Sequence, residues 1–147
     1  MLLISHRGNI NGKNVDLENH PSHVMRAIEL GYNVEVDVWF ENGVFSLGHD
    51  EPQHVIDVSF LKNDKIWCHA KNLQALDELL SEKIHCFWHQ EDDYTITSRG
   101  IVWAYPGKAL SSRSICVMPE WNYDVATIQL NCMGVCSDVI EKFKERL

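Results

Sequence analysis

Apolar residues of this chain gather in seven short runs that are separated by polar turns and amphipathic stretches, and this pattern predicts seven strands. The predicted strands cover residues 2–6, 34–39, 66–71, 85–89, 101–105, 114–119 and 134–137. Apolar residues at helical spacing predict three helices, over 21–31, 73–80 and 137–147. Strands that alternate with helices in this way favour a parallel sheet, in which functional side chains lie at the carboxyl ends of the strands.

The most informative run extends from Val34 to Asp50. Side chains on a strand alternate between its two faces, so Glu35 and Asp37 share one face while the valines of this run share the other. Two adjacent carboxylates are costly on such a strand unless a cation neutralises them, and Mg²⁺ or Ca²⁺ prefers oxygen ligands. After a turn at 41–43 the run ends on His49-Asp50, which brings an imidazole near the acids. Taken alone, the two acids would also fit the exposed face of an edge strand.

The first predicted strand supplies a matching half, because it leads directly into His6-Arg7-Gly8. Histidine is suited to proton transfer near neutral pH, and the planar guanidinium of arginine is suited to phosphate. Glycine allows a sharp turn or a close approach of the backbone to a ligand. The tripeptide is weak evidence alone, but it becomes specific when Glu18-Asn19, a helix, Glu35-x-Asp37 and His49-Asp50 follow it in this order.

This ordered set resembles the glycerophosphodiester phosphodiesterase family, within the phospholipase C-like phosphodiesterases. The family pattern is His-Arg-Gly, Pro-Glu-Asn, a helix, Glu-x-Asp and His-Asp; residues 1–50 follow it well, and a looser likeness continues through Lys71. A faint further likeness to the last strand of the family lies at 134–138. The resemblance implies a TIM-like (β/α) barrel and metal-dependent hydrolysis of a small phosphodiester.

The resemblance also implies roles for individual residues. His6 and His49 would be the general acid/base pair, and Arg7 would contact the substrate phosphate. Glu35 and Asp37 would hold a divalent metal, Mg²⁺ or Ca²⁺. In the family the attacking group is often a neighbouring hydroxyl of the substrate, which gives a cyclic phosphate intermediate.

The sequence departs from the family pattern at two residues and in a slightly shorter hairpin between Asp37 and His49. Leu17 stands where the family has proline before Glu-Asn. The family's third strand carries a metal-binding Glu two residues before a Lys; here Lys71 matches and would add positive charge near the phosphate, but His69 occupies the acidic position. The third metal ligand is therefore open between His69 and Glu120, which follows the strand at 114–119.

Size indicates a shortened or incomplete barrel in one domain spanning 1–147. The chain has about 21 residues for each predicted strand and its connection, fewer than the roughly 30 of a full βαβ unit. Some connections must therefore lack helices. The apolar strands at 101–105 and 114–119 need cover on both faces, so a loop or another chain must cover them, and a homodimer is expected.

Composition and charge limit the kinds of binding partner and the cellular location expected for this protein. A net charge of −8 and a pI near 5.4 argue against a nucleic-acid or anionic-membrane surface. No apolar stretch approaches the length of a membrane span, and the amino terminus lacks the pattern of a signal peptide. Five cysteines without a regular framework predict reduced thiols and a cytoplasmic location.

Other interpretations compete with this one. Asp138, with Glu141 three residues later, fits a helix-capping pair better than a catalytic role. Pairs of cysteines and histidines at loose spacing give little support for zinc, and no cysteine has an evident base partner. Two rival functions stay open: an inactive or weak member that binds a phosphorylated ligand, and an enzyme acting on a phosphodiester in a glycan or lipid head group.

Overall fold

The computed structural model describes residues 1–147, which form ten strands, four α-helices and one 3₁₀ helix. The strands are β1 (Leu2–His6), β2 (Asn33–Glu41), β3 (Val44–Leu47), β4 (His54–Ile56), β5 (Ile66–Ala70), β6 (Cys86–Phe87), β7 (Tyr94–Ile96), β8 (Val102–Ala104), β9 (Ser114–Val117) and β10 (Gly134–Ser137). The helices are α1 (Pro21–Glu29), α2 (Val58–Leu61), α3 (Leu73–Ser81), α4 (Ile140–Lys144) and the 3₁₀ helix η1 (Pro119–Trp121). All seven predicted strands are present, and β3 forms the expected hairpin with β2. The short elements β4, β7 and α2 are additions to the prediction.

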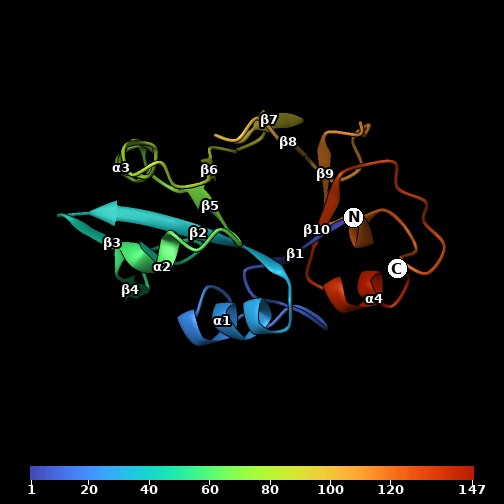
Figure 1. The fold of residues 1–147 in the computed structure, drawn as a ribbon, viewed down its shortest axis with the longest axis horizontal. Coiled ribbons are helices and arrows are strands. Elements are labelled where there is room, and N and C mark those ends of the chain that lie inside the picture. The colour runs from blue at the N-terminus through green and yellow to red at the C-terminus, as the bar shows by residue number, and fades with distance from the viewer.

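The strands form a mixed α/β fold with a curled sheet and few helices, as the sequence predicted (Figure 1). Seven strands run parallel to their neighbours in the order β6-β5-β2-β1-β10-β9-β8. β6 and β8 do not pair with each other; β7 pairs antiparallel with β8. Side-chain and backbone hydrogen bonds, such as Ser98 N–H to the Cys86 carbonyl at 2.8 Å, connect the segment around β7 to β6. The sheet therefore curls into a half-barrel and does not close, because β6 and β8 are not paired.

Alternation along the strands separates two layers. The valines of β2 and Ile66, Cys68 and Ala70 of β5 face outward into a core that α1 and α3 cover. The other face of the same strands points to the inside of the curl, where Trp67, Phe87 and Trp103 pack with Ile4 and Ile115. Because the inner face changes from apolar to polar toward the carboxyl ends of the strands, the inside of the curl has an apolar floor and a charged upper part.

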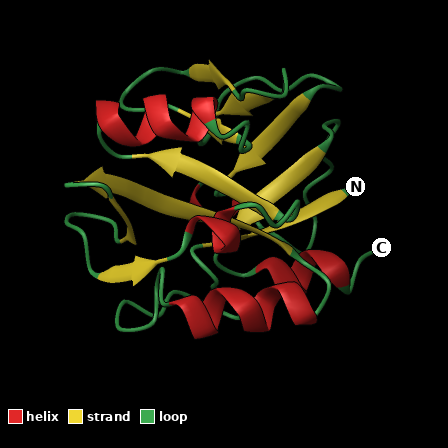
Figure 2. Ribbon diagram, turned by 60° about the vertical axis from the view of Figure 1, so that its left-hand side comes forward, coloured by secondary structure: helices red, strands yellow, loops and turns green.

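Helices cover only part of the outer surface. Figure 2 shows the strands between α3 on one side and α1 and α4 on the other. Between β6 and β10 the only helix is the three-residue η1. There, apolar side chains of the loops pack against β9, β10 and α4: Leu110, Val125, Ile128 and Leu130. As predicted, some connections between strands lack helices. A loop of the same chain covers this face.

The last predicted helix is shorter than expected, since α4 covers only 140–144. The predicted cap is wrong: Val139 occupies the N-cap position, and no side chain caps the helix. Asp138 instead turns inward and accepts a hydrogen bond from His6. No helix combines the length and the apolar character that crossing a membrane requires.

The buried His85 makes a prediction about acid stability. Its ring is 3 % exposed, packs 4.3 Å from the Trp67 ring and has no hydrogen-bond partner at either nitrogen. Burial, with a smaller contribution from the Arg99 charge, lowers its pKa from 6.5 to about 4. Between these values the unfolded chain binds more protons than the folded one, so stability falls as the pH falls.

Replacing His85 with Phe should therefore reduce the loss of stability between pH 7 and pH 5 by about 2 kcal/mol. Urea unfolding of both proteins at the two pH values measures the difference. An equal loss in the variant and the wild type would show that His85 does not carry the acid sensitivity.

Candidate functional site

A cavity of about 740 Å³ opens at the carboxyl ends of the parallel strands. It is lined by residues of β1, of the part of β2 that pairs with β5, and of the ends of β5, β8 and β9, by the start of the segment after β10, and by the loop that follows β3. Six residues predicted from the sequence line it: His6, Arg7, Glu35, His49, His69 and Lys71. Asp37 lies directly beneath them, fully buried. The strand arrangement thus brings together residues from distant parts of the sequence.

The turn after β1 fixes the first two of these side chains. Arg7 adopts a left-handed conformation with φ 54°, and Gly8 follows with φ 91°. A Cβ atom on Gly8 would lie 2.7 Å from the His23 ring of α1, so only glycine fits there. The Arg7 backbone donates to the Glu35 carbonyl at 2.9 Å, which fixes the turn against β2.

The two acids of β2 are buried in the interior of the curl, with Glu35 2 % exposed and Asp37 0 % exposed. Asp37 Oδ2 lies 2.8 Å from Arg7 Nε, and Asp37 Oδ1 lies 3.6 Å from Lys71 Nζ. Even so, Glu35 Oε2 and Asp37 Oδ1 have no hydrogen-bond partner. Buried carboxylate oxygens without a partner are costly, so these two atoms fit a bound cation.

His69 completes this group from the neighbouring strand β5. Its Nε2 lies 2.9 Å from the His89 carbonyl oxygen, which can only accept, so Nε2 carries the proton. Its Nδ1 then faces Asp37 Oδ1 at 3.2 Å and Glu35 Oε1 at 3.7 Å. A nitrogen lone pair opposite two carboxylates is unfavourable unless a proton or a metal ion lies between them.

One ligand atom from each of Glu35, Asp37 and His69 lies within 4.8 Å of the others. A metal-binding histidine commonly donates its second ring N–H to a carbonyl, as His69 does here. Of the two candidates for the third ligand, the structure therefore places His69 at the acids. Glu120 lies elsewhere, where Oε1 accepts from Ser137 Oγ at 2.8 Å and from the Asp138 backbone at 2.9 Å.

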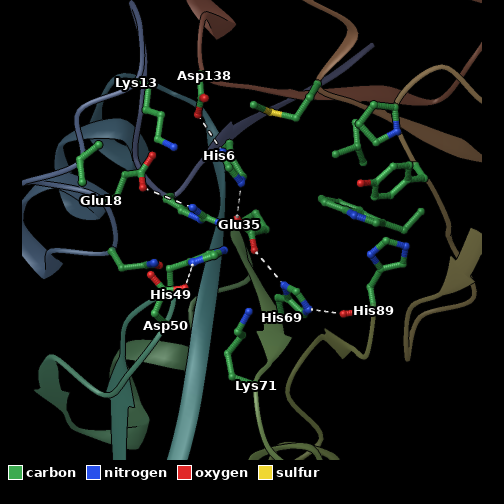
Figure 3. A pocket seen from close by; sticks show the side chains of 18 of the residues that line it. His6, Lys13, Glu18, Glu35, His49, Asp50, His69, Lys71, His89 and Asp138 are labelled. Carbon is green, nitrogen blue, oxygen red and sulfur yellow. Dashed lines mark hydrogen bonds and ion pairs between the residues drawn. The ribbon is translucent and has the colours of Figure 1, made fainter. Parts of the chain in front are cut away.

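His6 is oriented by Asp138, for which the sequence favours a helix-capping role. His6 Nδ1 lies 2.7 Å from Asp138 Oδ1, and Nε2 lies 3.9 Å from Glu35 Oε2 (Figure 3). Glu120 holds the Asp138 backbone from behind. Asp138 can therefore fix the orientation of the imidazole, with Nε2 turned toward the cavity.

His49 reaches the same cavity from the loop after β3, and its Nδ1 lies 2.7 Å from Asp50 Oδ1. Gly48 makes this loop possible, since a Cβ there would collide with the Glu51 carbonyl oxygen. His49 is more exposed than His6, with 44 % of its side chain accessible against 15 %. Each histidine therefore has one nitrogen beside a carboxylate.

Three further polar residues around the site were not given roles from the sequence. Asn19, with φ 61°, donates to Asp37 Oδ2 and accepts from the Asp37 backbone, both at 2.9 Å. Asn9 donates to Glu18 at 2.9 Å and to Asp138 at 2.8 Å. Glu18 in turn lies 3.2 Å from Arg7 NH1. The Glu18-Asn19 motif was the available signal; Asn9 had none, since it lay in an ordinary polar loop.

Electrostatics differ between neighbouring groups. Burial and the adjacent Asp37 carboxylate raise the pKa of Glu35. Burial alone would raise the pKa of Asp37, but the His69 ring 3.2 Å from Oδ1 and the charges of Arg7 and Lys71 lower it overall. Burial alone would lower the pKa of His6, yet the Asp138 hydrogen bond and the Glu35 charge raise it overall. Asp37 is therefore the firmly ionised acid of the pair.

The two hydrogen bonds from Asn19 make a prediction about stability. Replacing Asn19 with Ala leaves the buried Asp37 carboxylate and N–H without these partners, and should lower the free energy of unfolding by roughly 2 to 4 kcal/mol. Asn42 also has positive φ, at 51°, but lies in the exposed β2–β3 turn, so Asn42→Ala is the matched control. Chemical denaturation measures both. Equal losses in the two variants would contradict the role of Asn19.

Comparisons of the chain with protein-family models, with curated proteins and with solved structures each found no match. The likeness to glycerophosphodiester phosphodiesterases therefore rests on the motifs at residues 1–50 and on Lys71.

Proposed function

We propose that the protein is a metal-dependent phosphoric diester hydrolase acting on a small, glycerophosphodiester-like substrate. The observation that carries the proposal is the buried group of Glu35, Asp37 and His69, with unpartnered oxygens and a facing lone pair, beneath a cavity that also contains two histidines. Glu35, Asp37 and His69 would hold Mg²⁺ or Ca²⁺. When bound, the metal would offset negative charge on the phosphate oxygens.

Arg7 and Lys71 add fixed positive charge to the same part of the cavity. Arg7 is held by Asp37 and Glu18, so its guanidinium is positioned before a ligand arrives. Lys71 directly follows β5 and lines the cavity. Preorganised cations of this kind favour a phosphate and the charge that develops on it during displacement.

Two imidazoles are available for the proton transfers. One of His6 and His49 would accept the proton of the attacking oxygen as it bonds to phosphorus. The other would donate a proton to the alcohol oxygen as its bond to phosphorus breaks. The attacking oxygen comes from water or from a neighbouring hydroxyl of the substrate; in the second case a cyclic phosphate forms first, and phosphorus NMR detects it.

We also propose that the curled sheet is a shortened TIM-like (β/α) barrel. Seven parallel strands follow one another around the sheet in sequence order, and the candidate site lies at their carboxyl ends.

The five cysteines form no disulfide, which supports a reducing compartment such as the cytoplasm. A homodimer is proposed from exposed Tyr94 and Ile96 on β7, and static light scattering measures the mass.

A second candidate function is binding of a phosphorylated ligand without turnover. The observation that favours it is His69, because an imidazole replaces a carboxylate among the ligands of a hard cation. The assay therefore compares phosphodiesters with and without Mg²⁺, Ca²⁺ and Mn²⁺, after treatment with a chelator. Binding of a phosphate ester with no hydrolysis under any of these conditions would favour the second candidate.

The metal proposal predicts a thermal shift that depends on Glu35. Metal at about 100 times its dissociation constant should raise the melting temperature of the wild type by roughly 5 to 10 °C. In Glu35→Gln the melting temperature without metal should stay level or rise, because the repulsion with Asp37 is relieved. The shift on adding metal should be lost.

The matched control is Asp64→Asn, since the Asp64 side chain is 92 % exposed and lies outside the cavity. This variant should keep the full shift. Retention of the shift in Glu35→Gln would remove Glu35 from the metal site.

The histidine proposal predicts large kinetic effects. His6→Ala and His49→Ala should each lower kcat by roughly 10²- to 10⁴-fold, whereas the KM should change much less. Steady-state assays with a glycerophosphodiester measure both constants. His54→Ala is the control, because His54 does not line the cavity. Near-full activity in either His6→Ala or His49→Ala would disprove the two-histidine mechanism.

A further inference from the structure

The two sides of the cavity differ in chemistry. Figure 3 shows Lys13, Glu18 and Asp50 on one side of Glu35 and His89 on the other. The charged side also includes His49. On the opposite side, in addition to His89, the ends of β8 and β9 and the segments that follow them contribute Trp103, Tyr105, Pro106, Val117, Met118 and Trp121. These six residues form what we call the aromatic wall, and none of them carries a charge.

The aromatic wall leaves large rings accessible to the cavity. Trp103 is 4 % exposed and packs 4.6 Å from the Phe87 ring, so it joins the aromatic wall to the apolar floor inside the curl. Tyr105 is 40 % exposed and Trp121 is 63 % exposed. Exposed aromatic rings that line a cavity are available to a ligand.

The wall is connected to the groups that would act on the phosphate. The Tyr105 ring lies 5.5 Å from the His89 ring, and the His89 carbonyl accepts from His69. Trp121 follows Glu120, which holds the backbone of Asp138. Each accessible ring is therefore tied by a short series of contacts to a residue of the proposed site.

Backbone geometry also fixes the wall. Met118 has the left-handed conformation, with φ 45°, and turns the chain from β9 into η1, where Trp121 N–H donates to the Met118 carbonyl at 3.1 Å. Gly107, with φ 79°, packs so closely on Asn122 that a Cβ would lie 3.3 Å from its side-chain oxygen. The segments carrying Tyr105 and Trp121 therefore support each other.

We propose that the aromatic wall binds one alcohol of the phosphodiester, and that this alcohol carries an uncharged sugar-type ring. The inference rests on the proposed function, because it takes the phosphate to lie over Glu35, Asp37 and Arg7. A cavity of about 740 Å³ has room for a ring in addition to a phosphate and a glycerol. The C–H face of a sugar ring packs on Tyr and Trp, and Gln90, which also lines the cavity, offers an amide to its hydroxyls.

The charge of the wall argues against a cationic alcohol. A quaternary ammonium site combines aromatic faces with nearby negative charge, but no carboxylate lies among the residues of the wall. The carboxylates of the cavity lie at its centre and on its charged side, as Figure 3 shows for Glu18 and Asp50. The polar side then receives the second alcohol, for which glycerol is suited.

The test compares three diesters that share glycerol phosphate and differ in the second alcohol: glucose linked through its 6-hydroxyl, glycerol, and choline. Wild-type kcat/KM should be at least about tenfold higher for the glucose diester than for either of the others. Trp121→Ala should reduce this preference to less than about twofold. Tyr123→Ala is the matched control, because Tyr123 is 46 % exposed on the same segment but does not line the cavity; it should keep the preference.

Equal or greater turnover of the glycerol or choline diester would overturn the sugar-ring proposal and leave the phosphodiesterase proposal standing. Turnover of none of the three would overturn the proposed function instead. In that case calorimetry with glucose 6-phosphate and glycerol 3-phosphate decides the ring. Tighter binding of glucose 6-phosphate that is lost in Trp121→Ala supports the aromatic wall, and equal affinities overturn it.

Discussion

Two carboxylates buried side by side on β2 are the constraint on which the rest of this structure depends. Glu35 and Asp37 cannot both be ionised inside the curled sheet unless cations or hydrogen-bond donors surround them. Arg7, Asn19 and His69 come from three different segments, and each meets this pair. The turn after β1, the loop before α1 and the end of β5 are therefore positioned by the same requirement.

The oxygens of these two acids differ in whether they have hydrogen-bond partners, and this difference has a chemical consequence. Asp37 Oδ2 is held by Arg7 and Asn19, whereas Asp37 Oδ1 and Glu35 Oε2 have no hydrogen-bond partner. A protein that used the pair only for stability would gain from partners on every oxygen. The unpartnered oxygens lie beneath the cavity, where a divalent cation would restore the balance of charge and draw a phosphate to the same place.

The second half of the chain has few helices, and its connections contribute to the candidate site. From β6 to β10 the connections form loops and the short η1 in place of crossover helices. Some of these loops fold over the outer face of β9 and β10, while the segments after β8 and β9 carry Tyr105 and Trp121 to the cavity. In this part of the chain, helices therefore give little cover, and long connections form one side of the cavity.

The sequence by itself determined the seven parallel strands and the two faces of β2, because alternation is local and the valine face could only point into a core. It also placed His6, Arg7, Glu35, Asp37 and His49 at one edge, since parallel strands align their carboxyl ends. Tertiary structure decided which side chains each of these residues contacts.

Asp138 shows why the partners could not be predicted. Its spacing to Glu141 matched a helix cap, which stabilises a helix by about 1 kcal/mol. The hydrogen bond to the partly buried imidazole of His6, more than a hundred residues away, stabilises the fold by more than this. The Asp138 side chain therefore binds His6 and does not cap the helix. The same holds for Asn9 and Asn19, whose contacts cross between segments. Local spacing contains no information about such contacts, because they exist only once the strands have been brought side by side.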